Sequence, residues 1–262
     1  MSNFRFTPYD DVNAILGEVL TGARAILGDN FVGMYLDGSL ASGDFSYETS
    51  DIDFVAATAR EVSVTQMEEL VKMHGRIGQT DSKWAIELEG AYIPLPALRR
   101  YDTHNATHPY IDRGASNLRW EHLDVDWVIH RYVLTNWGVA LAGPPVRSLI
   151  DPVMPAELRQ ATADLLAQWW APMLDDPTHL GHGGYRAYAV MTMCRALYTL
   201  QQGDVISKPA AGRWALTHLD ERWADLIERA MNWENGRPMS NLQETQAFIR
   251  FTIEQSMRNL PR

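Results

Sequence analysis

The sequence has a single cysteine, Cys194, and no uninterrupted apolar run long enough to cross a bilayer. One cysteine excludes a disulfide framework and any zinc site built on several thiolates, and we expect Cys194 to be a buried apolar side chain. A membrane helix needs about 18 consecutive apolar residues, so no membrane-spanning segment is predicted. Residues 1–11 also lack the basic start and apolar centre of a signal peptide. Together these absences predict a cytoplasmic protein.

Basic residues are scarce relative to acidic ones. The chain has 23 Lys+Arg against 33 Asp+Glu, which gives a formal net charge of −10 at pH 7. Nucleic-acid binders normally carry a basic surface, so a nucleic-acid partner is not expected. An acidic cleft would instead concentrate a cationic ligand. The apolar fraction of 46% is ordinary for a globular protein, and no feature of the composition specifies an oligomeric state.

The pattern of apolar residues divides the 262 residues into two parts. Up to about residue 150, predicted strands and helices alternate, which favours an α+β domain over residues 1–150. After the proline-containing stretch 151–155, only helical spacing is found, so residues 151–262 are predicted to be an all-helical domain. Its expected helices are the segments 156–174, 185–202, 210–219, 222–232 and 241–259. In the first part we expect residues 84–89 to be a strand, 99–116 a loop and 124–142 a single helix.

The most informative stretch pairs a Gly-Ser step with an Asp-x-Asp step. Gly38 and Ser39 end a short buried strand, and Asp51 and Asp53 lie on the strand that follows. Because side chains alternate along a strand, both carboxylates point to one face and form a hard-oxygen site suited to Mg²⁺. A glycine beside a serine lets backbone N–H groups and a hydroxyl approach a phosphate.

A third carboxylate is available on the next predicted strand. Glu87 and Glu89 share one face there, and either could join the aspartates. A phosphate-binding turn with three acids is the set that metal-assisted phosphoryl transfer requires. A second Asp-x-Asp pair, Asp124 and Asp126, lies in a helical pattern, where residues two apart do not share a face, so we expect no metal there.

These motifs resemble the nucleotidyltransferase superfamily, which has the polymerase-beta-like fold. More closely, the chain is similar to the aminoglycoside 3''-adenylyltransferases, which modify streptomycin and spectinomycin. The likeness extends to Ser50 before the aspartate pair, to the segment 85–88, and to Arg195 followed thirteen residues later by Lys208 and by Trp214. It covers nearly the whole chain.

The resemblance implies a mechanism and a set of roles. Asp51, Asp53 and Glu87 would bind Mg²⁺, with Glu87 also the general base on the substrate hydroxyl, while ATP is the co-substrate. The triphosphate would be bound by the residues Gly38, Ser39, Ser50, Arg195 and Lys208. AMP would pass to a hydroxyl of a small cationic molecule with release of pyrophosphate, in a site between the two domains. Arg and Lys are suited to a triphosphate because they supply charge-assisted hydrogen bonds.

Substrate contacts are where the chain departs from the resembled family. Tyr185 stands where that family has an acidic residue that contacts the aminoglycoside, and Trp120 is the nearest counterpart of its substrate-binding tryptophan. Both are candidate substrate-binding residues. A protein or tRNA acceptor, or a nucleotide sensor without catalysis, are the alternative functions.

Several side chains also have structural interpretations. Arg195 could form a salt bridge between domains, and Lys208 could cap a turn. His122 and His130, in the expected helical region, are predicted to be core or rim residues rather than ligands.

Overall fold

The structure is a computed structural model that describes residues 5–114, 117–234, 239 and 241–259. It divides into two compact units, residues 1–152 and 153–262. The expected boundary, near residue 150, lies two residues before this division. The mixed α+β class predicted from the sequence is confirmed, with a six-stranded sheet in the first unit and helices in the second. No helix among the described residues has both the length and the apolar character to cross a membrane.

The first unit is built on a mixed sheet with the strand order β5-β4-β3-β2-β1-β6. Strands β2 and β3 are parallel, and all other neighbouring pairs are antiparallel. The strands span β1 Phe31–Leu36, β2 Ile52–Thr58, β3 Leu88–Pro94, β4 Thr107–Ile111, β5 Arg119–His122 and β6 Val139–Ala142. The helices of this unit are α1 Asp10–Leu27, α2 Gly38–Ser42, α3 Val64–Ile77, α4 Leu95–Arg99 and α5 Trp127–Trp137.

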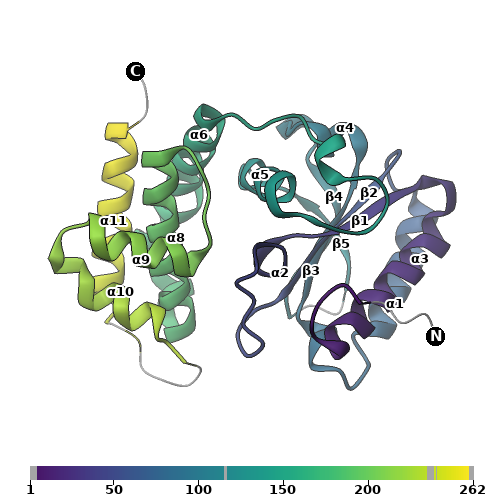
Figure 1. Ribbon diagram of the computed structural model, residues 1–262, viewed down its shortest axis with the longest axis horizontal. Coiled ribbons are helices and arrows are strands. Elements are labelled where there is room, and N and C mark those ends of the chain that lie inside the picture. The colour runs from purple at the N-terminus through teal and green to yellow at the C-terminus, as the bar shows by residue number, and fades with distance from the viewer. Residues whose placement is uncertain (1–4, 115–116, 235–238, 240, 260–262) are drawn as a thin grey trace. The chain divides into compact units, whose positions relative to one another are not determined.

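Two apolar cores lie on the two faces of this sheet. Helices α1 and α3 cover one face, and α5 lies on the other side (Figure 1). The apolar side of α1, including Val12, Leu16 and Val19, is buried against that first face, as its helical spacing predicts. Helix α3 begins with a capping box between Ser63 and Gln66, which satisfies backbone N–H groups at its start.

Three strands were not expected from the sequence. The interval 124–142 was predicted as one helix, but α5 ends at Trp137 and Val139–Ala142 is strand β6, paired with β1. Apolar spacing continues across Gly138, so periodicity alone did not reveal the change. The segment expected to be a loop, 99–116, contains β4, and its residues 115 and 116 lie outside the described residues. The third strand, β5, alternates too little to be recognised.

The second unit is helical throughout its described part. Its helices are α6 Pro155–Leu165, α7 Pro172–Asp175, α8 Gly183–Gln202, α9 Lys208–His218, α10 Ala224–Met231 and α11 Leu242–Asn259. The expected helix 156–174 is interrupted by a π-helical turn at Leu166–Trp170. Helix α8 is the centre of the unit and packs against α6, α9, α10 and α11. Cys194 on α8 is fully buried in this core, and burial raises the pKa of its thiol to about 12.

Candidate active site

Three acidic residues lie side by side across the middle of the sheet. Asp53 on β2 pairs in register with Glu89 on β3, and the pair Leu36–Phe54 places Asp37, just after β1, opposite Asp53. The backbone N–H of Asp37 donates to the Asp53 carbonyl at 3.1 Å. Since side chains alternate along each strand, all three project to the face that α5 covers. We call Asp37, Asp53 and Glu89 the carboxylate row.

Part of this row can hold a cation together with Asp51. One carboxylate oxygen from each of Asp51, Asp53 and Glu89 lies within 4.8 Å of the others. All three residues are partly buried, and oxygen donors in this number and spacing suit a hard divalent ion such as Mg²⁺. The expectation that the two aspartates lie together is met, and Glu89 is the third acid.

Burial and crowding raise the pKa of two of these acids. Burial, and then the neighbouring charges of Asp51, Glu89 and Asp37, raise the pKa of Asp53 well above its ordinary value. Burial also raises the pKa of Glu89, although a hydrogen bond of 2.7 Å from the Tyr110 hydroxyl works in the opposite direction. A bound cation would relieve this repulsion, so the electrostatics fit a metal site.

The Gly38–Ser39 step lies directly beside Asp53. It forms the start of the short helix α2 rather than an open loop. Gly38 has a φ of +58°, and a Cβ at this position would lie 1.9 Å from Asp53 Oδ2. Only glycine therefore fits here, on both conformational and steric grounds. The Ser39 hydroxyl is buried and has no hydrogen-bond partner among the described residues, which fits a group that receives a ligand.

Ser50 lies in the turn that leads to Asp51. Its hydroxyl accepts a hydrogen bond from the Ser46 N–H at 3.0 Å, and its own N–H donates to the Ser46 carbonyl at 2.9 Å. The turn is anchored nearby, where Lys83 Nζ donates to the Tyr47 carbonyl at 2.8 Å. Ser50 thus fixes the approach to Asp51, and its role toward a nucleotide stays a prediction.

The structure corrects the position of Glu87. Residues 84–89 were expected to be a strand, but Lys83–Ile86 is a 3₁₀ turn and the strand begins at Leu88. Trp84 is buried in this turn, and its indole N–H donates to Asp11 at 2.8 Å. The apolar residue that suggested a strand therefore packs the turn into the core instead. Glu87 consequently is not in the group of Asp51, Asp53 and Glu89.

Glu87 has a different partner. Its carboxylate accepts from Arg113 Nε at 2.5 Å, and another nitrogen of Arg113 lies 3.7 Å from Asp51. The choice of Glu87 over Glu89 as metal ligand and base is therefore not supported by this geometry. Glu89, which shares a face with Glu87 in the sequence pattern, is the acid that lies with Asp51 and Asp53.

The remaining candidate residues lie elsewhere in the fold. Trp120 is on the edge strand β5, paired with Pro109, and is 43% exposed. Tyr185, Arg195 and Lys208 belong to the second unit. Tyr185 lies in the first turn of α8, and Arg195 lies in the same helix, partly buried.

The ring of Tyr188 lies near both Tyr185 and Lys208. The rings of Tyr185 and Tyr188 are 5.5 Å apart, and Lys208 Nζ lies 4.1 Å from the centre of the Tyr188 ring. The structure thus brings Tyr185 and Lys208 to one surface of the helical unit, while Lys208 also begins α9.

Sequence reasoning missed two residues of the site. Asp37 immediately precedes the Gly-Ser step, but only the antiparallel register of β1 and β2 shows that it faces Asp53. His130 Nδ1 on α5 lies 2.6 Å from Asp37 Oδ2, so His130 is a partner of the row and not simply a rim residue. The position of Asp37 before Gly38 was the available signal, whereas nothing in the sequence indicated His130.

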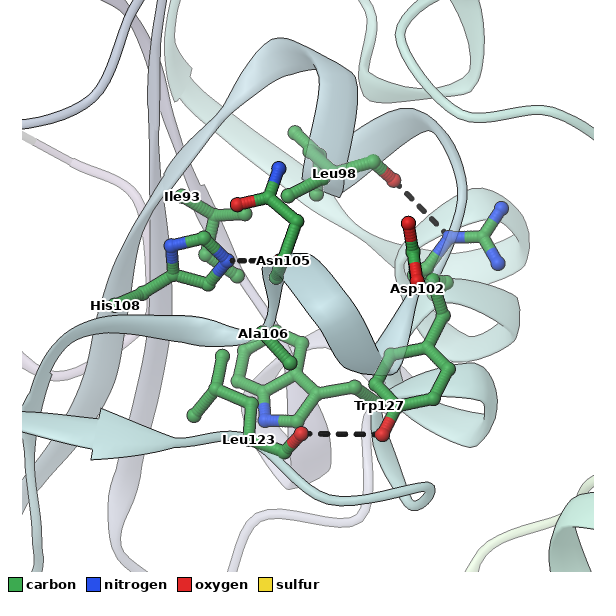
Figure 2. Close-up of a pocket in the computed structure, with 11 residues that line it drawn as sticks. Ile93, Leu98, Asp102, Asn105, Ala106, His108, Leu123 and Trp127 are labelled. Carbon is green, nitrogen blue, oxygen red and sulfur yellow. Dashed lines mark hydrogen bonds between the residues drawn. The ribbon is translucent and has the colours of Figure 1, made fainter.

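A cavity in the same unit is too small to be a substrate site (Figure 2). It has a volume of about 10 Å³, enough for about one water molecule. Its wall includes Trp127 and the buried Arg131, whose guanidinium donates to the carbonyls of Leu98 and Arg99. The cavity belongs to the packing beneath α4 and α5.

Comparison with known proteins agrees with the likeness seen in the sequence. Residues 148–258 match the family described as the C-terminal domain of aminoglycoside adenylyltransferase. The chain is 24% identical over 229 residues to a spectinomycin 9-adenylyltransferase of Staphylococcus aureus, with 84% of each chain covered. It is 23% identical over 253 residues to an aminoglycoside (3'') (9) adenylyltransferase of Escherichia coli, covering 92% of this chain and 93% of the relative.

A solved structure shares the fold. The crystal structure of spectinomycin adenyltransferase from Enterococcus faecialis, with ATP and spectinomycin, superposes with a TM-score of 0.73. Its sequence identity to this chain is 17%, and the match covers 93% of this chain and 98% of that one. The predicted fold, an α+β domain followed by an all-helical domain, is therefore confirmed. The chain resembles the aminoglycoside adenylyltransferases over nearly all of its length, and its residues 148–258 match the C-terminal domain of that family.

Proposed function

We propose that this protein transfers AMP from ATP to a hydroxyl group of an aminoglycoside-like molecule and releases pyrophosphate. The observation that carries the proposal is the group of Asp51, Asp53 and Glu89, with oxygens within 4.8 Å of one another, beside the Gly38–Ser39 step. The names of the relatives support the same reaction class. The net charge of −10 is compatible with a cationic acceptor.

Mg²⁺ fits the acidic group because its donors are carboxylate oxygens and because burial, together with their mutual repulsion, raises the pKa of Asp53. Asp51, Asp53 and Glu89 would hold the ion. When bound, Mg²⁺ neutralises phosphate charge and polarises the phosphoryl oxygens. The Ser39 hydroxyl and the backbone next to Gly38 would bind phosphate oxygens, in agreement with the lack of a partner for Ser39 Oγ.

Glu89 is our candidate for the general base. Burial raises its pKa, which makes its carboxylate a stronger base than an exposed one. The Tyr110 hydroxyl binds Oε1, which leaves Oε2 to take the proton of the acceptor hydroxyl. The acceptor oxygen then forms a bond to the α-phosphorus of ATP, and the bond from that phosphorus to pyrophosphate breaks.

Other residues carry proposed binding roles. Ser50, Arg195 and Lys208 are assigned to the nucleotide, and Tyr185 and Trp120 to the acceptor, on the basis of the resemblance. An aromatic rather than acidic residue at position 185 implies that the acceptor is contacted through packing there, so its preferred aminoglycoside can differ from those of the named relatives.

The test is pyrophosphate release from ATP and Mg²⁺ with a panel of aminoglycosides that includes streptomycin and spectinomycin. Release with one member, and none with the variant Asp53→Asn, would establish the reaction and identify the acceptor. ATP binding without release for any member would overturn transfer to aminoglycosides and favour a sensor or another acceptor. Absence of ATP binding would overturn the nucleotide site itself.

A further inference from the structure

The β1 end of the carboxylate row is buried more deeply than the rest. The Asp37 side chain is only 3% exposed, and its Oδ1 has no hydrogen-bond partner among the described residues. Its Oδ2 is bound by His130 Nδ1 at 2.6 Å. A carboxylate this deeply buried is costly unless a positive charge compensates it.

His130 is surrounded by acidic groups. Its second nitrogen, Nε2, lies 4.0 Å from Asp126 Oδ2, so the ring stands between two carboxylates. Its ring also packs on Trp127, with 5.0 Å between centres. Although burial alone would lower the pKa of His130, the charge and hydrogen bond of Asp37, with Asp126 and Asp53, raise it to about 9. The ring is therefore an imidazolium at neutral pH, and 35% of the side chain remains exposed.

The contacts of Asp37 connect this charge to the rest of the site. Asp37 precedes α2 but makes no side-chain cap bond to it, because the carboxylate is turned to α5. Its backbone is bound to Asp53, and the charges of Asp37 and His130 act on Asp53 in opposite directions. The charge of His130 also lowers the pKa of Glu89, against the effect of burial.

We propose that His130 is a positioning residue that supplies a fixed positive charge at the β1 end of the carboxylate row. This inference rests on the proposed function, since it assigns the charge to a site that binds a divalent ion and a triphosphate. The imidazolium offsets one of the crowded carboxylates and favours the negatively charged nucleotide. The same charge disfavours a divalent cation, so the two ligands respond to it in opposite directions.

A charge that strengthens nucleotide binding and weakens cation binding can be distinguished from a purely structural role, which would not change the two affinities in opposite directions. His130→Asn keeps an N–H donor near the position of Nδ1 but removes the charge. We expect it to bind Mn²⁺, without nucleotide, about 3- to 10-fold more tightly than wild type, the effect of one unit charge near a protein surface. Binding of ATP in the presence of Mg²⁺ should weaken by a similar factor. Both affinities are measured by isothermal titration on the full chain.

Control variants complete the experiment. His122→Asn makes the same replacement on the edge strand β5 and should leave both affinities unchanged. His130→Lys restores a charge without the ring and should return both affinities toward wild type. If His130→Asn binds both Mn²⁺ and ATP more weakly, or neither changes, the charge role is overturned while the metal site stands. If wild type binds no Mn²⁺, the proposed function fails, and the inference fails with it.

Discussion

Each face of the sheet has a histidine and a tyrosine, fully buried on one face and only partly buried on the other. On the face covered by α1 and α3, His74 Nε2 lies 2.8 Å from the Tyr92 hydroxyl, among apolar side chains that include Phe54. On the face covered by α5, His130 pairs with Asp37 and Tyr110 donates to Glu89. The first pair is part of a core, and the second pair lies at the two ends of the carboxylate row.

Neighbouring charge decides the protonation state of each histidine. Burial without an acid lowers the pKa of His74 to about 4, so this ring is neutral. Near Asp37, Asp126 and Asp53, the pKa of His130 is raised to about 9 in spite of burial. One sheet thus has a neutral histidine on one face and a charged one on the other, because carboxylates raise the pKa of His130 while burial lowers that of His74.

The largest expected effect comes from removing the proposed base, Glu89, on the face that α5 covers. Glu89→Gln removes the group that would accept the proton and should lower turnover by about 10²–10⁴-fold. Glu87→Gln is the matched change two residues away, where the carboxylate binds Arg113, and should alter turnover only a few-fold. Initial rates of pyrophosphate release measure both. A larger loss for Glu87→Gln would return the base to Glu87.

The next change fills the space beside Asp53. Gly38→Ala places a methyl group 1.9 Å from Asp53 Oδ2 and should abolish Mn²⁺ binding. Gly43→Ala is the control, because Gly43 also has a positive φ, +80°, but nothing lies within 4 Å of its Cβ position. Gly43→Ala should lose about 1–2 kcal/mol of unfolding free energy from left-handed strain, measured with urea, and Gly38→Ala should lose more because its methyl group also collides with Asp53. Equal Mn²⁺ affinities of the two variants would contradict the steric argument.

Removing one hydroxyl from each face sharpens the comparison. Tyr92→Phe leaves His74 Nε2 buried without a partner and should cost about 1–3 kcal/mol of unfolding free energy, with turnover retained. Tyr110→Phe should have the opposite pattern, with lower turnover and a smaller change in stability, because it removes a hydrogen bond that lowers the pKa of Glu89 and so leaves more of this carboxyl protonated and unable to accept a proton. Urea unfolding and initial rates are measured on both variants. Equal patterns would show that the faces do not differ in this way.

The smallest expected effect is in the pH dependence of stability. Because the pKa of His74 is lowered to about 4 in the folded chain, its contribution is lost as pH falls from about 6.5 toward 4. Because the pKa of His130 is raised to about 9, its contribution is fully present below about pH 6.5 and is lost as pH rises through about 9. Urea unfolding at a series of pH values should show His74→Gln flattening the acid side of the profile and His130→Asn the alkaline side. No change in either slope would overturn the assigned protonation states.

The sequence predicted those parts of the site that are close in the chain. Gly38, Ser39, Asp51 and Asp53 all lie near the ends of two adjacent strands, and the short buried strand expected before Gly38 is β1, Phe31–Leu36. The strand expected over residues 84–89 begins only at Leu88, because the buried Trp84 made a 3₁₀ turn resemble a strand, and it is Glu89 that lies with Asp51 and Asp53. Asp37 and His130 are 93 residues apart, so their contact depends on how α5 crosses the sheet, which local patterns do not contain.

The edges of the sheet affect how readily the protein aggregates at high concentration. Strands β5 and β6 form the two edges and have only four residues each. Arg119 on β5 is paired with Glu121 at 2.6 Å, and β6 is followed directly by Gly143 and two prolines, which offer no N–H for pairing. Short edges with charges and prolines give another chain little backbone on which to add a strand. The sheet that concentrates repelling carboxylates at its centre is thus protected at its margins against edge-to-edge aggregation.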